Sequence, residues 1–195
     1  MTIRCAPFVL AGIAFAAVIV THLVNFGADD LRAQLLDANS DASWSHLLIA
    51  GTLAVATGIC LLGARRPREQ THAWIAVTGI LAFISFDEIS SLHSTIDQMS
   101  WGKLVYTPIL LALCLCLWKI SARSARNIEL RAGLVTLLIS FGIHVFGPHI
   151  VHVLGYGTSS WLYQTKVALK QGTELAGWLL VVMGLSRIAL SRPAR

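Results

Sequence analysis

Charged residues are scarce in this chain. Asp, Glu, Lys and Arg make up 13% of the 195 residues, which is about half the usual share for a soluble domain. A soluble protein of this length needs a charged shell around its core, and this composition cannot supply one. With 55% hydrophobic residues and a mean hydropathy of +0.69, a disordered tail and most cytosolic enzymes are excluded, and an integral membrane protein remains.

Cysteine is also rare, with four residues in the chain. Four thiols spread over a long apolar sequence do not form the framework of a secreted disulfide-rich protein. Cys114 and Cys116 lie about 200° apart around a helix, so they cannot clamp one metal ion together. We expect the cysteines to be small apolar packing residues.

Long apolar stretches dominate what is present. Six of them are long enough for a helix to cross a bilayer, which takes roughly 17–25 residues. The sequence therefore predicts an all-α transmembrane bundle that forms a single domain over residues 1–195. The six predicted spans are Pro7–Phe26, Trp44–Gly63, Ala73–Ser91, Leu104–Ile120, Ala132–Leu154 and Val167–Leu190.

The distribution of charge predicts the orientation of these spans. Most of the 15 Lys and Arg residues fall in loops on the side that carries both termini, and that side is expected to be cytoplasmic. Most of the acidic residues fall on the opposite side. We therefore expect a multi-pass protein of the bacterial inner membrane. The basic residues are divided among separate short loops, which argues against nucleic-acid binding.

Ionisable side chains gather in the outward half of the predicted bundle. Such groups are costly at membrane depth, so they usually face the bundle interior and mark function. Five spans contribute them, which predicts an outward-facing cavity. The candidate residues are His22, His46, Asp87, Glu88, His93, Asp97, His144, His149, His152, Lys170 and Glu174.

The third span carries the densest polar pattern. Asp87, His93 and Asp97 lie on one helical face together with intervening serines, whereas Glu88 lies off that face. His93 and Asp97 are one turn apart, so the carboxylate could fix the imidazole tautomer for a metal ligand or a general base. The alternative is that Asp97 caps the helix end and His93 lies at the interface.

The last two spans add a histidine pair and an ion pair. His149 and His152 are three residues apart and can bind one metal ion, relay a proton or face the lipid headgroups. Lys170 and Glu174 are four residues apart and can form an ion pair, which could serve function or only fix helix packing. His144 is expected near a bend caused by Pro148.

Ser85-Phe86-Asp87-Glu88, followed by His93, resembles a motif of a widespread family of small bacterial polytopic membrane proteins. This resemblance implies the fold and the membrane location, and no activity. A weaker similarity is to the alkaline ceramidase and adiponectin-receptor superfamily of intramembrane metal hydrolases. That similarity implies a zinc site with Asp87, His93, His149 and His152, although the family has seven spans and spaces its paired histidines by four residues.

The first functional hypothesis is a metal-dependent membrane enzyme, similar to a hydrolase, that acts on a lipid or another amphiphile. Zinc or another divalent metal would take three protein ligands and keep one position open for water. A nearby carboxylate would act as the general base. The predicted metal ligands are His93, His149 and His152, and the predicted catalytic residues are Asp87, Glu88 and Glu174.

Three other functions remain open from the sequence. A proton- or cation-linked transporter or channel would use Asp87, Glu88, His144, Lys170 and Glu174 as a relay or binding site. An accessory subunit of a membrane complex would need the polar layer only to join helices. A haem carrier would pair His22 or His46 with His144, and the many carboxylates nearby argue against it. The oligomeric state is not predicted.

Overall fold

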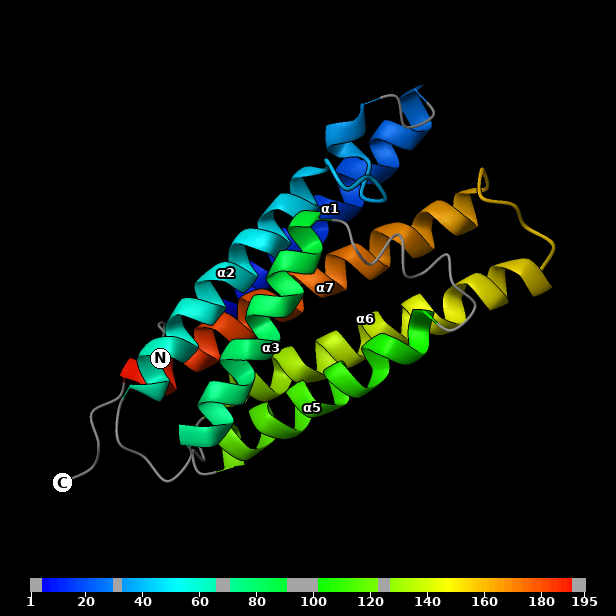
Figure 1. The fold of residues 1–195 in the computed structure, drawn as a ribbon. Coiled ribbons are helices and arrows are strands. Elements are labelled where there is room, and N and C mark those ends of the chain that lie inside the picture. The colour runs from blue at the N-terminus through cyan, green and yellow to red at the C-terminus, as the bar shows by residue number, and fades with distance from the viewer. Residues whose placement is uncertain (1–4, 30–32, 66–70, 91–101, 123–126, 191–195) are drawn as a thin grey trace. The chain divides into compact units, whose positions relative to one another are not determined.

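The chain folds entirely into helices and connecting segments over the residues that the structure, a computed structural model, describes. These residues are 5–29, 33–65, 71–90, 102–122 and 127–190, and the side chains of 102–105 are not included. Figure 1 shows the helices in chain order by colour. They are α1 (Ala6–Asp29), the short 3-10 helix η2 (Gln34–Leu36), α2 (Trp44–Ala64), α3 (Thr71–Ser90), α5 (Gly102–Ala122), α6 (Ile128–Val153) and α7 (Trp161–Leu190).

The all-α class predicted from the hydrophobic runs is confirmed. Each of the six predicted spans coincides with one long helix. The largest difference is at α7, which begins at Trp161, ahead of the predicted Val167. The reason is Ser160, whose hydroxyl accepts the N–H of Tyr163 at 3.2 Å and so caps the helix before its apolar part starts.

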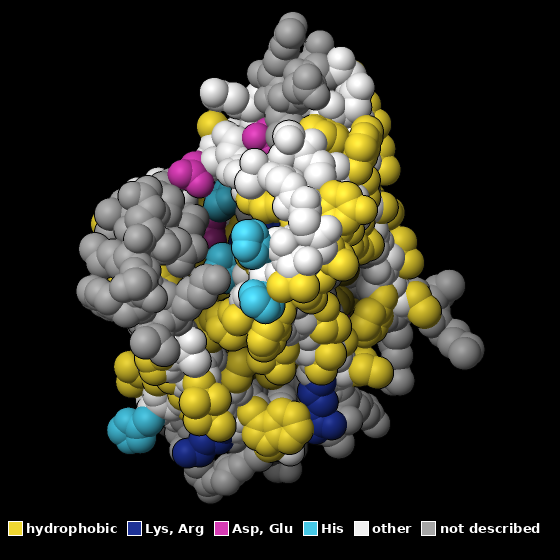
Figure 2. All heavy atoms as spheres, turned by 90° about the vertical axis from the view of Figure 1, so that its right-hand side faces the viewer, with side chains coloured by type: hydrophobic (Ala, Val, Ile, Leu, Met, Phe, Trp, Pro, Cys, Tyr) yellow, Lys and Arg dark blue, Asp and Glu magenta, His cyan; other side chains and the backbone are white. Residues whose placement is uncertain are grey.

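Five of the helices are long and apolar enough to cross a membrane: α1, α2, α3, α6 and α7. In α5, the apolar part with described side chains, Tyr106–Ala122, is shorter than these five helices. The chain is therefore a multi-pass membrane protein by the length and composition of its helices. Figure 2 shows hydrophobic side chains over much of one face, with histidine and acidic side chains gathered near one another.

Local signals in the sequence set the helix ends. Ser43 caps α2, because its hydroxyl accepts the N–H of His46 at 3.3 Å. Just after the C-terminal end of α6, Gly155 adopts a positive φ of 77°. The N–H of Gly155 bonds to the carbonyl of His152, and the N–H of Tyr156 bonds to the carbonyl of Val151. This pair of bonds is the Schellman motif, which a glycine at this position makes possible without strain.

The chain divides into two compact units. The first unit comprises residues 1–49 and 135–179, and the second comprises residues 50–134 and 180–195. The first unit therefore holds α1, η2, the start of α2, most of α6 and the first two-thirds or so of α7. The second unit holds the rest of α2, α3, α5, the start of α6 and the end of α7.

Within the first unit, glycines let helices approach α7 closely. A Cβ atom at Gly172 would lie 2.9 Å from the ring of Phe15, and one at Gly177 would lie 2.9 Å from the side chain of Leu137. Small residues at such crossings are typical of membrane helix packing, because they bring backbones together. They place α1 and α6 against α7, and this positions the polar residues of all three helices.

Candidate functional site

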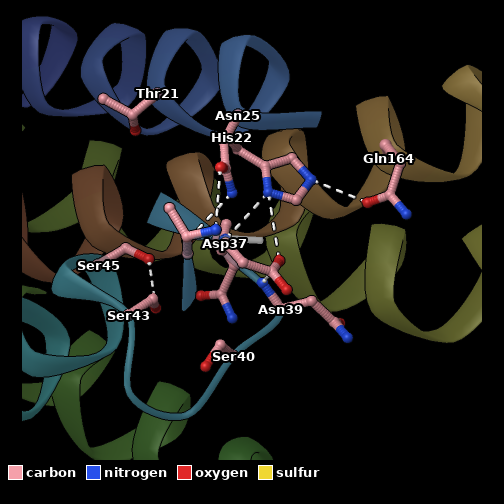
Figure 3. A network of polar contacts seen from close by, with 12 residues as sticks. Thr21, His22, Asn25, Asp37, Asn39, Ser40, Ser43, Ser45 and Gln164 are labelled. Carbon is pink, nitrogen blue, oxygen red and sulfur yellow. Dashed lines mark hydrogen bonds and ion pairs between the residues drawn. The ribbon is translucent and has the colours of Figure 1, made fainter. Parts of the chain in front are cut away.

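A fully buried histidine lies at the centre of the first polar group. His22, near the end of α1, has an exposed fraction of 0%. Its Nδ1 accepts the backbone N–H of Ala38 at 3.0 Å, and its Nε2 lies 3.0 Å from Oε1 of Gln164 on α7. Figure 3 shows this ring between the segment after α1 and helix α7. Both ring nitrogens therefore have protein partners.

The hydrogen bonds define the tautomer of His22. A backbone N–H can only donate, so Nδ1 must be the acceptor and the proton must be on Nε2. Nε2–H then donates to Oε1 of Gln164. The amide of Gln164 agrees with this assignment, because its NH2 group donates to the carbonyl of Thr158 at 2.7 Å. The imidazole is therefore neutral in this arrangement, with its proton on Nε2.

Two side chains of α1 hold the segment of residues 33–43 that connects α1 to α2. Asn25 makes a pair of bonds with Ala33: its NH2 group donates to the carbonyl at 3.1 Å, and its carbonyl oxygen accepts the N–H at 3.3 Å. Farther along the segment, His22 holds Ala38 through the single bond to its N–H. Asp37 lies between Ala33 and Ala38 in the sequence, and its Oδ1 is 3.5 Å from Nδ1 of His22. We call these five residues, with Gln164, the His22 network.

A second imidazole, that of His46, contacts a glutamine of α7 seven residues after Gln164. His46, in the first turn of α2, is buried, and its Nε2 lies 3.1 Å from the side-chain nitrogen of Gln171, which is also buried. Gln164 and Gln171 are seven residues apart, so they project from almost the same face of α7. Helix α7 therefore presents a row of amides to histidines from α1 and α2.

An ion pair follows directly on the same helix. Nζ of Lys170 lies 2.7 Å from Oε2 of Glu174, as the spacing of four residues predicts. The two side chains are 23% and 18% exposed. The Glu174 carboxylate also interacts electrostatically with His46 and with His144 of α6. We call His46, His144, Lys170, Gln171 and Glu174 the α7 polar site.

Helix α6 supports this site through its backbone contact with α7. The hydroxyl of Ser140 donates to the carbonyl oxygen of Lys170 at 2.9 Å. Thr173 donates to the same carbonyl at 2.9 Å. This carbonyl therefore has additional donors beyond the ordinary helical bond, and the turn that carries the ion pair is fixed to α6.

The acids predicted on the third span lie in the second unit. Asp87 is buried, with an exposed fraction of 3%, and its Oδ1 accepts the hydroxyl of Tyr106 on α5 at 3.1 Å. Glu88 follows it on α3, and its side chain includes a buried oxygen. Tyr106 is thus a partner that the sequence pattern did not identify, because an apolar helix with one tyrosine gives no motif.

Of the predicted metal ligands, the structure describes His149 and His152 but not His93. His149 and His152 are both exposed near the end of α6, three residues apart. His93 and Asp97 lie outside the described residues. Among the residues that are described, no group of three or more His, Cys, Asp or Glu side chains is arranged to hold a metal ion.

Gln164 and Gln171 were not predicted as part of the site, because their side-chain amides are polar but not ionisable. Both are buried, at 5% and 4% exposed, and both contact a histidine. The available signal was the repeat of a polar amide at seven residues within an apolar span. An amide in lipid is costly without a partner, so such a repeat predicts partners on a neighbouring helix.

Residues 7–188 of this chain match a family described as a domain of unknown function, DUF8692. The chain belongs to this family. No curated protein and no solved structure matches the chain. The description of this family assigns no function, so the membership assigns no activity to the chain. It gives no information on the similarity to ceramidases and adiponectin receptors.

Proposed function

We propose that this DUF8692 protein is a proton-linked membrane transporter or channel in which Glu174 of the α7 polar site binds the proton. The observation that carries the proposal is the Lys170–Glu174 ion pair within α7, with imidazoles from two further helices in electrostatic range. Ionisable residues within a membrane-spanning helix are expensive, and they are typical of proton relays and ion pathways.

The chemistry of the site supports reversible protonation. Glu174 forms an ion pair with Lys170 one turn away, and protonation of the carboxylate would break this pair, so binding and release of a proton change the contacts of the site. The imidazoles of His46 and His144 interact with this carboxylate, and an imidazole can carry a proton on either ring nitrogen. Gln171 bonds to the His46 ring and so holds it in a defined orientation. A proton could therefore pass between an imidazole and the carboxylate with only side-chain movements.

The experiment uses the purified full-length protein in liposomes that contain a pH-sensitive dye, with a potassium diffusion potential as the driving force. We expect the wild type to move protons faster than protein-free liposomes. Glu174→Gln keeps the shape of the side chain and removes the proton-binding site, so flux should fall about tenfold or more. Unchanged flux in Glu174→Gln would refute the proposal.

The matched control is Glu129→Gln in the second unit. Glu129 is also a buried carboxylate in an ion pair, in this case with Arg187 of α7. It is not part of the α7 polar site, so the variant should retain wild-type flux per folded molecule. Equal losses in both variants would indicate a general effect of removing a buried carboxylate.

The metal-dependent membrane hydrolase predicted from the sequence is the second candidate. His149 and His152 favour it, because histidines three residues apart on a helix can share one metal ion, and both rings are exposed. Their substrate would be a lipid or another amphiphile, and a carboxylate would act as the general base. Its test is elemental analysis of the purified protein after exposure to zinc.

We expect bound zinc in the wild type and a loss of that zinc in the double variant His149→Ala, His152→Ala. His72→Ala is the control, because His72 is also exposed but lies at the start of α3 in the second unit. A wild-type protein that binds no zinc would exclude this candidate. A protein that binds zinc and moves no protons would favour it over the transporter.

A further inference from the structure

The His22 network contains a second titratable group that the α7 polar site does not use. His22 is fully buried and lies between three parts of the first unit: α1, the connecting segment 33–43 and α7. Its two hydrogen bonds join the backbone of Ala38 to the side chain of Gln164 through one ring (Figure 3). A change in the protonation of this ring must therefore change at least one of those bonds.

The bond to Ala38 is the one that a second proton would remove. The neutral ring accepts the Ala38 N–H at Nδ1, whereas a protonated ring would present an N–H there. Two donors would then face each other at 3.0 Å. Ala38 is 2% exposed, so its N–H could not turn to water without movement of the segment. The bond from Nε2 to Gln164 would be unaffected, because Nε2 is a donor in both states.

An alternative acceptor is already in place for the protonated ring. Oδ1 of Asp37 lies 3.5 Å from Nδ1 and at present accepts the N–H of Asn39 at 2.9 Å. Among the described residues, Asp37 is the charged group that faces His22. The partner from α7, Gln164, and the neighbouring Asn25 of α1 are neutral amides. Protonation would thus exchange a backbone donor for a carboxylate acceptor one residue earlier in the segment.

We propose that His22 is a proton-operated switch. The neutral ring holds the connecting segment 33–43 against α1 through the bond to Ala38, and the protonated ring releases Ala38 and bonds to Asp37 instead. The segment leads directly to Ser43, the cap of α2, and then to His46 of the α7 polar site. The switch therefore provides a route by which acid on one side of the membrane changes the start of α2. It does not depend on proton transport by Glu174.

The test combines amide hydrogen exchange with nitrogen NMR of the histidine rings, on the full-length protein in lipid nanodiscs. We expect the neutral Nε2–H tautomer of His22 at neutral pH. As the pH is lowered from about 7.5 to about 4, a range that covers buried as well as exposed imidazoles, exchange in the segment, corrected for the chemical exchange rate, should increase about tenfold through loss of a buried hydrogen bond. Peptides from the middle of α1 should not respond.

Three variants assign the response. His22→Gln should abolish the pH dependence, and Asp37→Asn should require more acid for the same opening, because the protonated ring loses its acceptor. His46→Gln should leave the opening intact, because the His46 ring bonds to Gln171 and the bond from His46 to Ser43 is made by the backbone N–H, which the substitution keeps. His72→Gln, exposed and in the second unit, is the control for general effects of removing a histidine.

A wild type without pH-dependent opening, or a neutral ring with its proton on Nδ1, would overturn the switch. A His22→Gln variant that opens like the wild type would do the same, as would loss of the response in His46→Gln alone. If His22→Gln does not fold, Asp37→Asn and the ring tautomer of the wild type still decide. Failure of proton flux in the liposome assay would not affect any of these outcomes.

Discussion

The two units of the chain use their interiors differently. In the first unit, buried polar side chains bond to one another across helices: His22 to Gln164 and His46 to Gln171. In the second unit, the fully buried side chains are mainly large and apolar, such as Trp74, Leu81 and Leu117. Two buried acids of that unit, Asp87 and Glu129, also have partners on neighbouring helices. Buried polar side chains that need hydrogen-bond partners restrict the helices to one arrangement, whereas apolar side chains only need to fill the space between helices. This difference supports the proposal that the chemistry lies in the first unit.

The largest effect on stability is expected from the apolar interior of the second unit. Trp74 of α3 has an exposed fraction of 0% and its ring packs against Gly63 of α2. Trp74→Ala should lower the free energy of unfolding by about 3–5 kcal/mol, because it leaves a large cavity. Thermal unfolding in detergent micelles measures this loss. Trp161→Ala, which removes a 56% exposed ring, is the control, and equal losses in both would contradict the comparison.

A second prediction contrasts the two ion-paired carboxylates, Glu129, which is buried, and Glu174, which is partly exposed. Glu129 is 1% exposed, and Glu129→Gln should lower the free energy of unfolding by about 2 kcal/mol, since it removes the charged partner of Arg187 from a buried site. Glu174→Gln should cost less stability, because both members of its ion pair are partly exposed, and should lose proton flux. Unfolding curves and liposome flux, measured on the same two preparations, separate these effects. The reverse pattern would place the chemistry in the second unit.

A smaller effect tests the close helix contact in the second unit. A Cβ atom at Gly184 of α7 would lie 2.7 Å from the backbone nitrogen of Leu130 and 2.9 Å from its Cα. Backbone cannot move away easily, so Gly184→Ala should lower the free energy of unfolding by about 1–2 kcal/mol. The measurement is the unfolding midpoint in detergent. Gly12→Ala on α1, where a Cβ meets nothing within 4 Å, should be neutral or slightly stabilising.

The smallest effect is expected at Gly147 of α6 in the first unit. A Cβ atom there would lie 2.9 Å from Cγ of Lys166. That side chain is flexible and can shift, so Gly147→Ala should change the free energy of unfolding by about 0.5 kcal/mol or less. The unfolding midpoint checks this value. A loss as large as that of Gly184→Ala would show that Lys166 is held as firmly as backbone.

Much of the fold followed from the sequence alone. Each predicted span matches a helix, because a long apolar run has to satisfy its own backbone in lipid. The cap at Ser43 and the turn at Gly155 are local signals of the same kind. The ion pair of Lys170 and Glu174 was also predicted, since residues four apart on a helix always lie close together.

The candidate site was predicted only in part. His22 and His46 were recognised as polar residues at the ends of spans, but their partners Gln164 and Gln171 were not. These partners are more than a hundred residues away, and no local spacing relates them. The convergence of Asp87 and Glu88 with the histidines into one cavity stays a prediction, as does the metal site with His149 and His152.

The sequence by itself determined that this protein is helical, that its helices are apolar enough for a membrane and which stretch of the chain each helix occupies, because all of these depend on neighbours along the chain. Only the tertiary structure decided that His22 shares its ring between Ala38 and Gln164, and that His46 bonds to Gln171 beside the ion pair. The physical reason is that a buried polar group must find a partner, and which partner it finds depends on the helices that pack against it.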